Sequence, residues 1–275
     1  MEKEKNINLD NDVLLFNEKM EILRKEISKK IVGQNLLVRD LIIALFARGH
    51  ILLEGAPGLA KTLTIDTLSK TLDLKFKRIQ FTPDLLPSDL IGAKIYNQAS
   101  GNFSTKFGPI FSNFLLADEI NRAPSKVQSA LLEAMAERQI TIGEDTYKLE
   151  TPFIVLATQN PIEQEGTYSL PEAQLDRFLL KTIVDYPNEV EEIQIMKNNF
   201  IEALEVSKII SKEELIHYQE IVKNIYVDDK IFDYVKNIIF STRDTKKLAL
   251  ENIEKYISIH YLLELVFLLL LELKY

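Results

Sequence analysis

The sequence contains no cysteine, which excludes a disulfide scaffold, thiol catalysis and zinc sites with cysteine ligands. This absence also fits a cytoplasmic protein. Histidine is scarce, and the three that occur are scattered at His50, His217 and His260, which argues against a histidine-based metal site. The longest uninterrupted apolar run, Leu265–Leu271, is too short to cross a bilayer. The polar start, residues 1–6, has no apolar core of a signal peptide.

Basic residues are also fewer than acidic ones. The 33 lysines and arginines stand against 41 aspartates and glutamates, and this gives a formal net charge of −8. Such a balance argues against a large nucleic-acid footprint. The 275 residues, of which 46% are hydrophobic, are enough for one large or two modest globular domains.

A glycine-rich stretch lies between an apolar, strand-like run at 50–54 and a run with helical apolar spacing at 63–68. Small residues let successive backbone N–H groups curl around an anion, and the start of a helix attracts it further. We therefore predict a phosphate-binding loop, in which Lys61 reaches the β- and γ-phosphates of ATP and Thr62 ligates Mg2+. The predicted nucleotide contacts are Gly55, Ala56, Pro57, Gly58, Leu59, Ala60, Lys61 and Thr62. The alternative is an ordinary turn between a strand and a helix.

Position 60 departs from the general pattern of such loops, because Ala60 stands where a glycine is usual. A methyl group is tolerated there if the φ angle of the residue is negative. The departure weakens the pattern without removing the chemistry.

Strand-like runs recur along the chain and alternate with helical patterns. They cover residues 50–54, 76–80, 113–117, 152–157 and 178–184. Apolar runs interleaved with helices predict an α/β fold, with a five-stranded parallel sheet flanked by helices. Ligands bind at the carboxyl ends of the strands in such sheets. The phosphate loop, Asp118-Glu119 and Asn160 all follow strand-like runs.

We expect these three polar residues to bind the metal and to act on the water that attacks ATP. Asp118 supports Mg2+, Glu119 polarises the attacking water, and Asn160 contacts the γ-phosphate or orients that water. A strand that ends in a solvated acidic pair, and an asparagine in an Asn-Pro turn, are the structural alternatives.

Arg177 precedes the fifth strand-like run. It could act in its own site or reach the γ-phosphate of a neighbouring subunit. Arg122 is a second candidate for this role, and a surface arginine paired with Asp176 is the structural alternative.

Residues 94–107 and 139–149 have the alternating pattern of two hairpins. They are either surface ribbons or moving elements that push on a partner. Strand patterns fade after Pro187, and helical patterns follow, one of them opened by a capping box from Ser211 to Glu214. We predict a nucleotide-binding α/β domain at 1–187 and a small helical lid at 188–275.

With these residues in place, the chain resembles the MoxR family of AAA+ ATPases over roughly residues 31–258. The strings that carry the resemblance are GAPGLAKT, RIQFTPDLLPSDLIGAKIY, FLLADEINRAPSKVQSALLEAM, FIVLATQNPIEQEGTYSLPEAQLDRF and DYPNEVEEIQIMK. Alanine at position 60 is itself usual in that family.

The resemblance implies further properties. The segment with Val32 and Gly33 would pack on adenine, the hairpins would be the helix-2 insert and the presensor-1 hairpin, Asn160 would be sensor 1, and Arg177 the trans arginine finger. It implies a homo-hexameric ring with ATP and Mg2+ between subunits. It also implies a chaperone-like role in remodelling or inserting cofactors into a client, with a von Willebrand factor A domain protein as partner.

The sequence departs from the family after about residue 258, where the family carries Gly-Ala-Ser-Pro-Arg-Ala with the sensor-2 arginine. One hypothesis is a frameshift near His260 that leaves the lid truncated, and the other is a divergent apolar helix. The gene's nucleotides would decide between them.

The sequence thus predicts a Mg2+-dependent ATPase. Without sensor 2, a module that binds nucleotide but does not turn it over is the first alternative. A DNA-acting AAA+ motor is the second, and the acidic balance disfavours it.

Overall fold

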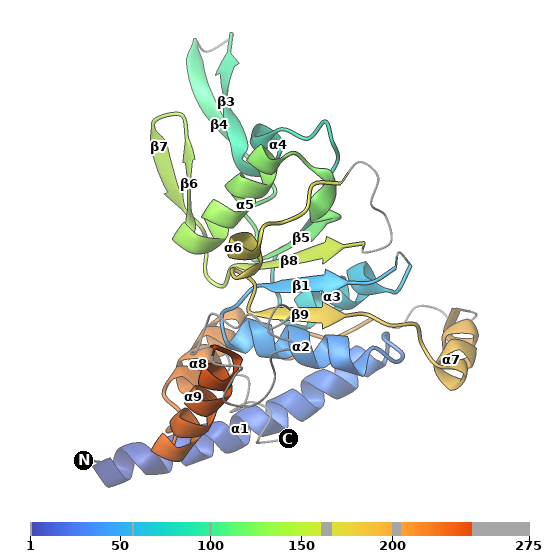
Figure 1. Cartoon of the computed structure of the whole chain (residues 1–275), viewed down its shortest axis with the longest axis vertical. Coiled ribbons are helices and arrows are strands. Elements are labelled where there is room, and N and C mark those ends of the chain that lie inside the picture. Colours follow the sequence, from blue (N-terminus) through green and yellow to red (C-terminus); the bar gives the residue numbers. More distant parts are fainter. Residues whose placement is uncertain (1, 57, 99–100, 161–166, 200–204, 244–275) are drawn as a thin grey trace. The chain divides into compact units, whose positions relative to one another are not determined.

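A computed structural model describes residues 2–56, 58–98, 101–160, 167–199 and 205–243 of the chain (Figure 1). The chain divides into two compact units, Met1–Ile221 and Val222–Tyr275. The helices α7 (Glu189–Asn199) and most of α8 (Lys212–Lys223) belong to the first unit, and α9 (Asp229–Arg243) to the second. The domain division at residue 187 stays a prediction.

The first unit is built on a five-stranded sheet in the order β2-β5-β8-β1-β9. Its strands are β1 (Ile51–Glu54), β2 (Phe76–Gln80), β5 (Phe114–Asp118), β8 (Ile154–Gln159) and β9 (Leu180–Ile183). All neighbours pair in parallel, and Figure 1 shows β5, β8, β1 and β9 side by side in this order. The predicted parallel α/β sheet is therefore confirmed.

The central strands β1, β5 and β8 are buried on both faces, to which alternate residues of each strand point. One face packs on α5 (Ser125–Glu137) through a core that includes Leu52, Leu115, Ala117, Val155, Ala157, Val127, Leu131, Leu132 and Met135. The intervening residues Leu53, Leu116 and Leu156 are fully buried as well. The helix α3 (Lys61–Thr71) contacts β5 and α1, and α2 (Asn35–Phe46) contacts β9.

The first helix, α1 (Glu2–Ser28), buries a stripe spaced at three and four residues, namely Phe16, Met20, Leu23 and Ile27. Tyr218 of α8 packs against this stripe, with its ring centroid 5.2 Å from that of Phe16. Gln219 of α8 also donates a hydrogen bond to the Leu45 carbonyl at 2.7 Å. These contacts fix the start of α8 on α1 and α2.

Two antiparallel hairpins extend from the sheet, as predicted. One joins β3 (Gly92–Asn97) to β4 (Asn102–Phe107), and the other joins β6 (Gln139–Ile142) to β7 (Asp145–Lys148). They lie side by side (Figure 1) and contact each other through β3 and β6. The Tyr147 ring stands edge-on to Phe107 at 5.0 Å, and its hydroxyl lies 3.0 Å from that of Thr105. Side chains therefore connect the hairpins.

Three short helices complete the first unit: α4 (Pro87–Ile91), the 3₁₀ turn η1 (Ile120–Arg122) and α6 (Glu172–Leu175). The predicted capping box is present at α8, where Ser211 N–H donates to Glu214 at 2.7 Å and Glu214 N–H to the Ser211 hydroxyl at 3.1 Å. No helix in the described part of the chain is long and apolar enough to reach across a bilayer. The departure after residue 258 lies outside the described residues.

Candidate functional site

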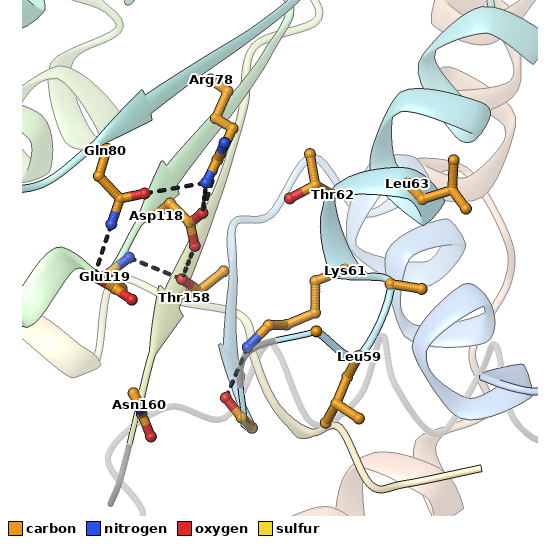
Figure 2. Close-up of a pocket in the computed structure, with 13 residues that line it drawn as sticks. Leu59, Lys61, Thr62, Leu63, Arg78, Gln80, Asp118, Glu119, Thr158 and Asn160 are labelled. Carbon is orange, nitrogen blue, oxygen red and sulfur yellow. Dashed lines mark hydrogen bonds and ion pairs between the residues drawn. The ribbon is translucent and has the colours of Figure 1, made fainter. Parts of the chain in front are cut away.

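A cavity of about 390 Å³ opens at the carboxyl ends of β1, β5 and β8. One wall is the loop after β1 and the start of α3, and the facing wall comes from β2, β5 and β8 (Figure 2). The lining residues are Gly55, Gly58, Leu59, Ala60, Lys61, Thr62, Leu63, Arg78, Gln80, Asp118, Glu119, Thr158 and Asn160. The structure thus brings together most of the residues predicted from sequence.

The loop wall has the properties of an anion site. The first N–H groups of any helix lack an intrahelical acceptor, and at the start of α3, which begins at Lys61, no side-chain cap takes its place. Gly58 has a φ of +85°, and a Cβ atom there would meet nothing within 4 Å. Gly55 is close-packed instead, because a Cβ atom would lie 2.6 Å from the Val184 carbonyl oxygen. Glycine is therefore required at the two positions for different reasons. Gly58 adopts a left-handed backbone conformation, and Gly55 leaves no room for a side chain.

Ala60 contradicts one expectation. Its φ is +55°, in the left-handed region, whereas tolerance of its methyl group had been tied to a negative φ. The left-handed conformation costs a non-glycine residue about 1–2 kcal/mol. A left-handed residue just before a helix turns successive N–H groups toward one point, which favours an anion there.

Lys61 lies at the floor of the cavity, where its ammonium donates a hydrogen bond to the Gly55 carbonyl at 2.7 Å (Figure 2). Burial lowers the pKa of Lys61, and the nearby charges of Asp118 and Glu119 raise it in part. The amine is thus held beside the loop and faces two carboxylates.

The two carboxylates are linked through Thr158 of β8. Its hydroxyl donates to Asp118 Oδ1 at 2.5 Å and accepts from the Glu119 N–H at 2.8 Å. Glu119 itself has a left-handed backbone, with φ +56° and ψ +52°. This backbone turns the chain out of β5, and Arg122 of η1 pairs with the Glu119 carboxylate at 3.1 Å.

Sequence reasoning missed Thr158, Arg78 and Gln80. Arg78 donates to Asp118 Oδ2 from Nη2 at 2.6 Å and from Nε at 3.0 Å. Gln80 donates to Glu119 at 2.7 Å. The strand register, once known, points to Gln80 and Thr158. Gln80 stands beside Asp118 in the β2–β5 pairing. Ala117 stands beside Ala157 in the β5–β8 pairing, so the next residues along, Asp118 and Thr158, are neighbours too.

Other predicted site residues lie outside the cavity lining. Arg177, which follows α6, is exposed and donates to the Leu132 carbonyl at 3.3 Å. Val32, Gly33 and Ala56 do not line the cavity either. Gly33 has a φ of +68° and approaches Glu191 of α7, whose Cδ would lie 2.8 Å from an added Cβ. The remaining one, Pro57, lies outside the described residues.

The residues present fit a nucleotide with a divalent cation. The loop, the uncapped helix start and the Lys61 amine suit phosphate oxygens, and the Thr62 hydroxyl and Asp118 carboxylate are hard oxygen donors that suit Mg2+. Among the described residues, no group of three or more histidine, cysteine, aspartate or glutamate side chains could hold a metal alone.

Comparison with known proteins gives the family. Residues 50–180 match the ATPase family associated with various cellular activities (AAA). The chain is 48% identical over 233 residues to Chaperone MoxR1 of Mycobacterium tuberculosis, and 47% identical over 230 residues to YeaC, an uncharacterised protein of Bacillus subtilis. The chain belongs to the MoxR family of AAA+ ATPases.

The alignments cover 85% of this chain with MoxR1 and 82% with YeaC, and they span 62% and 71% of those two proteins. Among solved structures, a candidate ATPase from Cytophaga hutchinsonii is 48% identical and superposes with a TM-score of 0.83. That match covers 90% of this MoxR-family chain and 76% of the other. The predicted AAA+ fold is confirmed.

Proposed function

We propose that this MoxR-family chain binds Mg2+ and ATP in the cavity and hydrolyses the ATP. One observation carries the proposal: a loop with an uncapped helix start and a lysine faces two carboxylates across one cavity (Figure 2). Bound Mg2+ would supply Lewis-acid polarisation of a phosphoryl oxygen and offset its charge.

Each residue of the cavity has a role in the proposal. The Lys61 amine and the N–H groups at the start of α3 hold the negative charge of the β- and γ-phosphates. The Thr62 hydroxyl and the Asp118 carboxylate hold the metal. Glu119 accepts a proton from the attacking water, and Asn160 orients that water. The support is their common position on the cavity lining.

Assembly is the second part of the proposal. Arg177 is exposed and absent from the lining of its own cavity, which suits a residue that acts on a neighbouring subunit. We place it at the γ-phosphate site of the next chain in a homo-hexamer, with Val32 and Gly33 against adenine. Elsewhere, such an arginine contributes about 10³–10⁵ in rate.

The downstream role is remodelling of a partner protein. One close relative carries the name Chaperone MoxR1, and by this likeness we propose that ATP turnover here drives maturation of, or cofactor insertion into, a client complex. We expect the partner to be a von Willebrand factor A domain protein. We also propose that this chain acts in the cytoplasm.

The test is the ATPase rate per subunit as a function of protein concentration. We expect the rate to rise as rings assemble, and to be lost in Lys61→Ala and Arg177→Ala. Lys70→Ala is a matched control because Lys70 lies on the same helix, α3, exposed and paired with Asp66. Nucleotide binding without turnover at any concentration would favour the non-hydrolysing alternative, and salt-sensitive DNA binding would revive the DNA motor.

Mixing the two inactive variants separates a trans from a cis role of Arg177. A Lys61→Ala subunit still carries Arg177, and an Arg177→Ala subunit still carries a complete phosphate loop. Mixed rings should therefore regain a fraction of the parent rate. If the mixture assembles and stays inactive, Arg177 does not act across the subunit boundary.

A further inference from the structure

Arg78 occupies the carboxylate that the proposed function assigns to the metal. It extends from the edge strand β2, and its Nη2 and Nε both donate to Asp118 Oδ2, at 2.6 and 3.0 Å. Nη2 also donates to the side-chain amide oxygen of Gln80, Oε1, at 3.1 Å. Arg78 and Gln80 are two residues apart on one strand, so both side chains lie on the same face. Figure 2 shows the guanidinium beside Asp118, across the cavity from Thr62.

The two oxygens of Asp118 differ in how firmly they are held. Oδ1 accepts the Thr158 hydroxyl at 2.5 Å, and Thr158 is 1% exposed and also bonded to the Glu119 N–H. Oδ2 accepts only Arg78 among the bonds that the structure describes, and the Arg78 side chain is 49% exposed. A long, half-exposed side chain can leave its partner, whereas a buried hydroxyl with two bonds cannot. Oδ2 is therefore the oxygen that a cation can gain.

The charges on the cavity lining balance. Two cations, Lys61 and Arg78, face two anions, Asp118 and Glu119. A divalent cation that enters alone must displace the guanidinium from Asp118 and then adds two positive charges beside Arg78 and Lys61, and like charges at this range repel. A cation that enters together with phosphates brings the negative charge that compensates for the displaced guanidinium.

We infer that Arg78 is a positioning residue that holds Asp118 Oδ2 until metal and nucleotide arrive together, so that the empty site does not take up a divalent cation by itself. This inference rests on the proposed function, since it assigns Asp118 to the metal. It makes the affinities for metal and nucleotide strongly coupled, and by linkage each ligand raises the affinity for the other by the same factor.

The experiment uses Mn2+ as a paramagnetic probe. Free Mn2+ is measured by electron paramagnetic resonance as the full chain is titrated, without nucleotide and with a non-hydrolysable ATP analogue. Without nucleotide, we expect Arg78→Gln to bind Mn2+ at least about tenfold more tightly than the parent. Lys77→Gln is the matched control, because Lys77 is the exposed neighbour on β2 and does not line the cavity. Its Mn2+ affinity should equal that of the parent.

Two further variants make the result interpretable. Arg78→Lys keeps the charge without the forked donor and should give an intermediate affinity. Asp118→Asn in the Arg78→Gln background should abolish the gained binding, which assigns the ion to Asp118. A gain that survives Asp118→Asn would overturn the inference.

The outcomes also separate this inference from the proposed function. Equal Mn2+ affinity of the parent and both Arg78 variants without nucleotide, with the analogue still bound, would overturn the role of Arg78 and leave the proposed function standing. Failure of the parent to bind the analogue would reject the proposed function itself.

Discussion

His50, the residue before β1, is a buried titratable side chain beside the start of β8. It is 6% exposed, and its Nδ1 accepts a hydrogen bond from the Val155 N–H of β8 at 2.9 Å. Burial, aided by the charge of Arg138, lowers the pKa of His50 from 6.5 to about 4, against a hydrogen bond with the Met135 backbone. The neutral imidazole thus bridges β1, β8 and α5, and protonation would remove the acceptor for Val155.

The consequence is a loss of stability in mild acid. Between pH 6.5 and about 4 the unfolded chain binds a proton that the folded His50 does not. The free energy of unfolding therefore falls as the pH falls through this window, and the contribution is complete only above pH 6.5. A shift of this size corresponds to about 3 kcal/mol, with a slope that approaches about 1.4 kcal/mol per pH unit.

Urea unfolding, followed by circular dichroism from about pH 7.5 to about pH 4.5, measures this slope. His50→Leu should be less stable at neutral pH by about 1–3 kcal/mol, because the Val155 N–H loses its acceptor. Its stability should nevertheless fall less steeply toward acid, by up to about 1 kcal/mol per pH unit. His217→Gln is the control, since His217 is exposed on α8. Parallel pH profiles of the parent and His50→Leu would refute the reasoning.

Three further predictions concern the loop, the cavity and the hairpins. Ala60→Gly relieves a left-handed alanine at the cost of a more flexible unfolded chain, so calorimetry should show a net stabilisation of about 0.5–1 kcal/mol, and a lower melting temperature would contradict it. Thr158→Val removes the hydroxyl on Asp118, so the ATPase rate should fall at least about tenfold while Thr158→Ser keeps it, and an active valine variant would exclude a role for the hydroxyl. Tyr147→Ala, in the hairpin of β6 and β7, removes a ring that packs on Phe107 of β4. Hydrogen exchange of the β4 amides should therefore speed up by about two- to tenfold. Unchanged exchange would mean that the two hairpins move separately.

Sequence patterns located the central strands β1, β5 and β8 because each is a short run that is almost entirely buried. Apolar spacing is a weaker guide for α1, where Leu14, Leu15 and Ile22 are apolar but lie off the buried stripe. These three side chains are 61%, 55% and 49% exposed. A helix with apolar residues all around has several possible stripes, and tertiary packing on Tyr218 selects the one through Phe16.

The residues missed in the cavity share a physical reason. Arg78 and Gln80 belong to β2, and nothing in their own segment says which strand lies beside it. Their partners, Asp118 and Glu119, follow from the pairing of β2 with β5, which is separated by more than thirty residues along the chain. Local pattern therefore predicted which residues end a strand, but not which side chains meet across strands.

Glu119 shows why the cavity depends on more than its predicted acidic pair. Its left-handed backbone is strained for a non-glycine residue, by about 1–2 kcal/mol. The hydrogen bond from its N–H to the Thr158 hydroxyl offsets part of that strain. The same hydroxyl fixes Asp118. Thr158 thus holds both the Asp118 carboxylate, which is proposed for the metal, and the backbone of Glu119, whose carboxylate is proposed to act on the water. A substitution of Thr158 should therefore disturb both carboxylates at once.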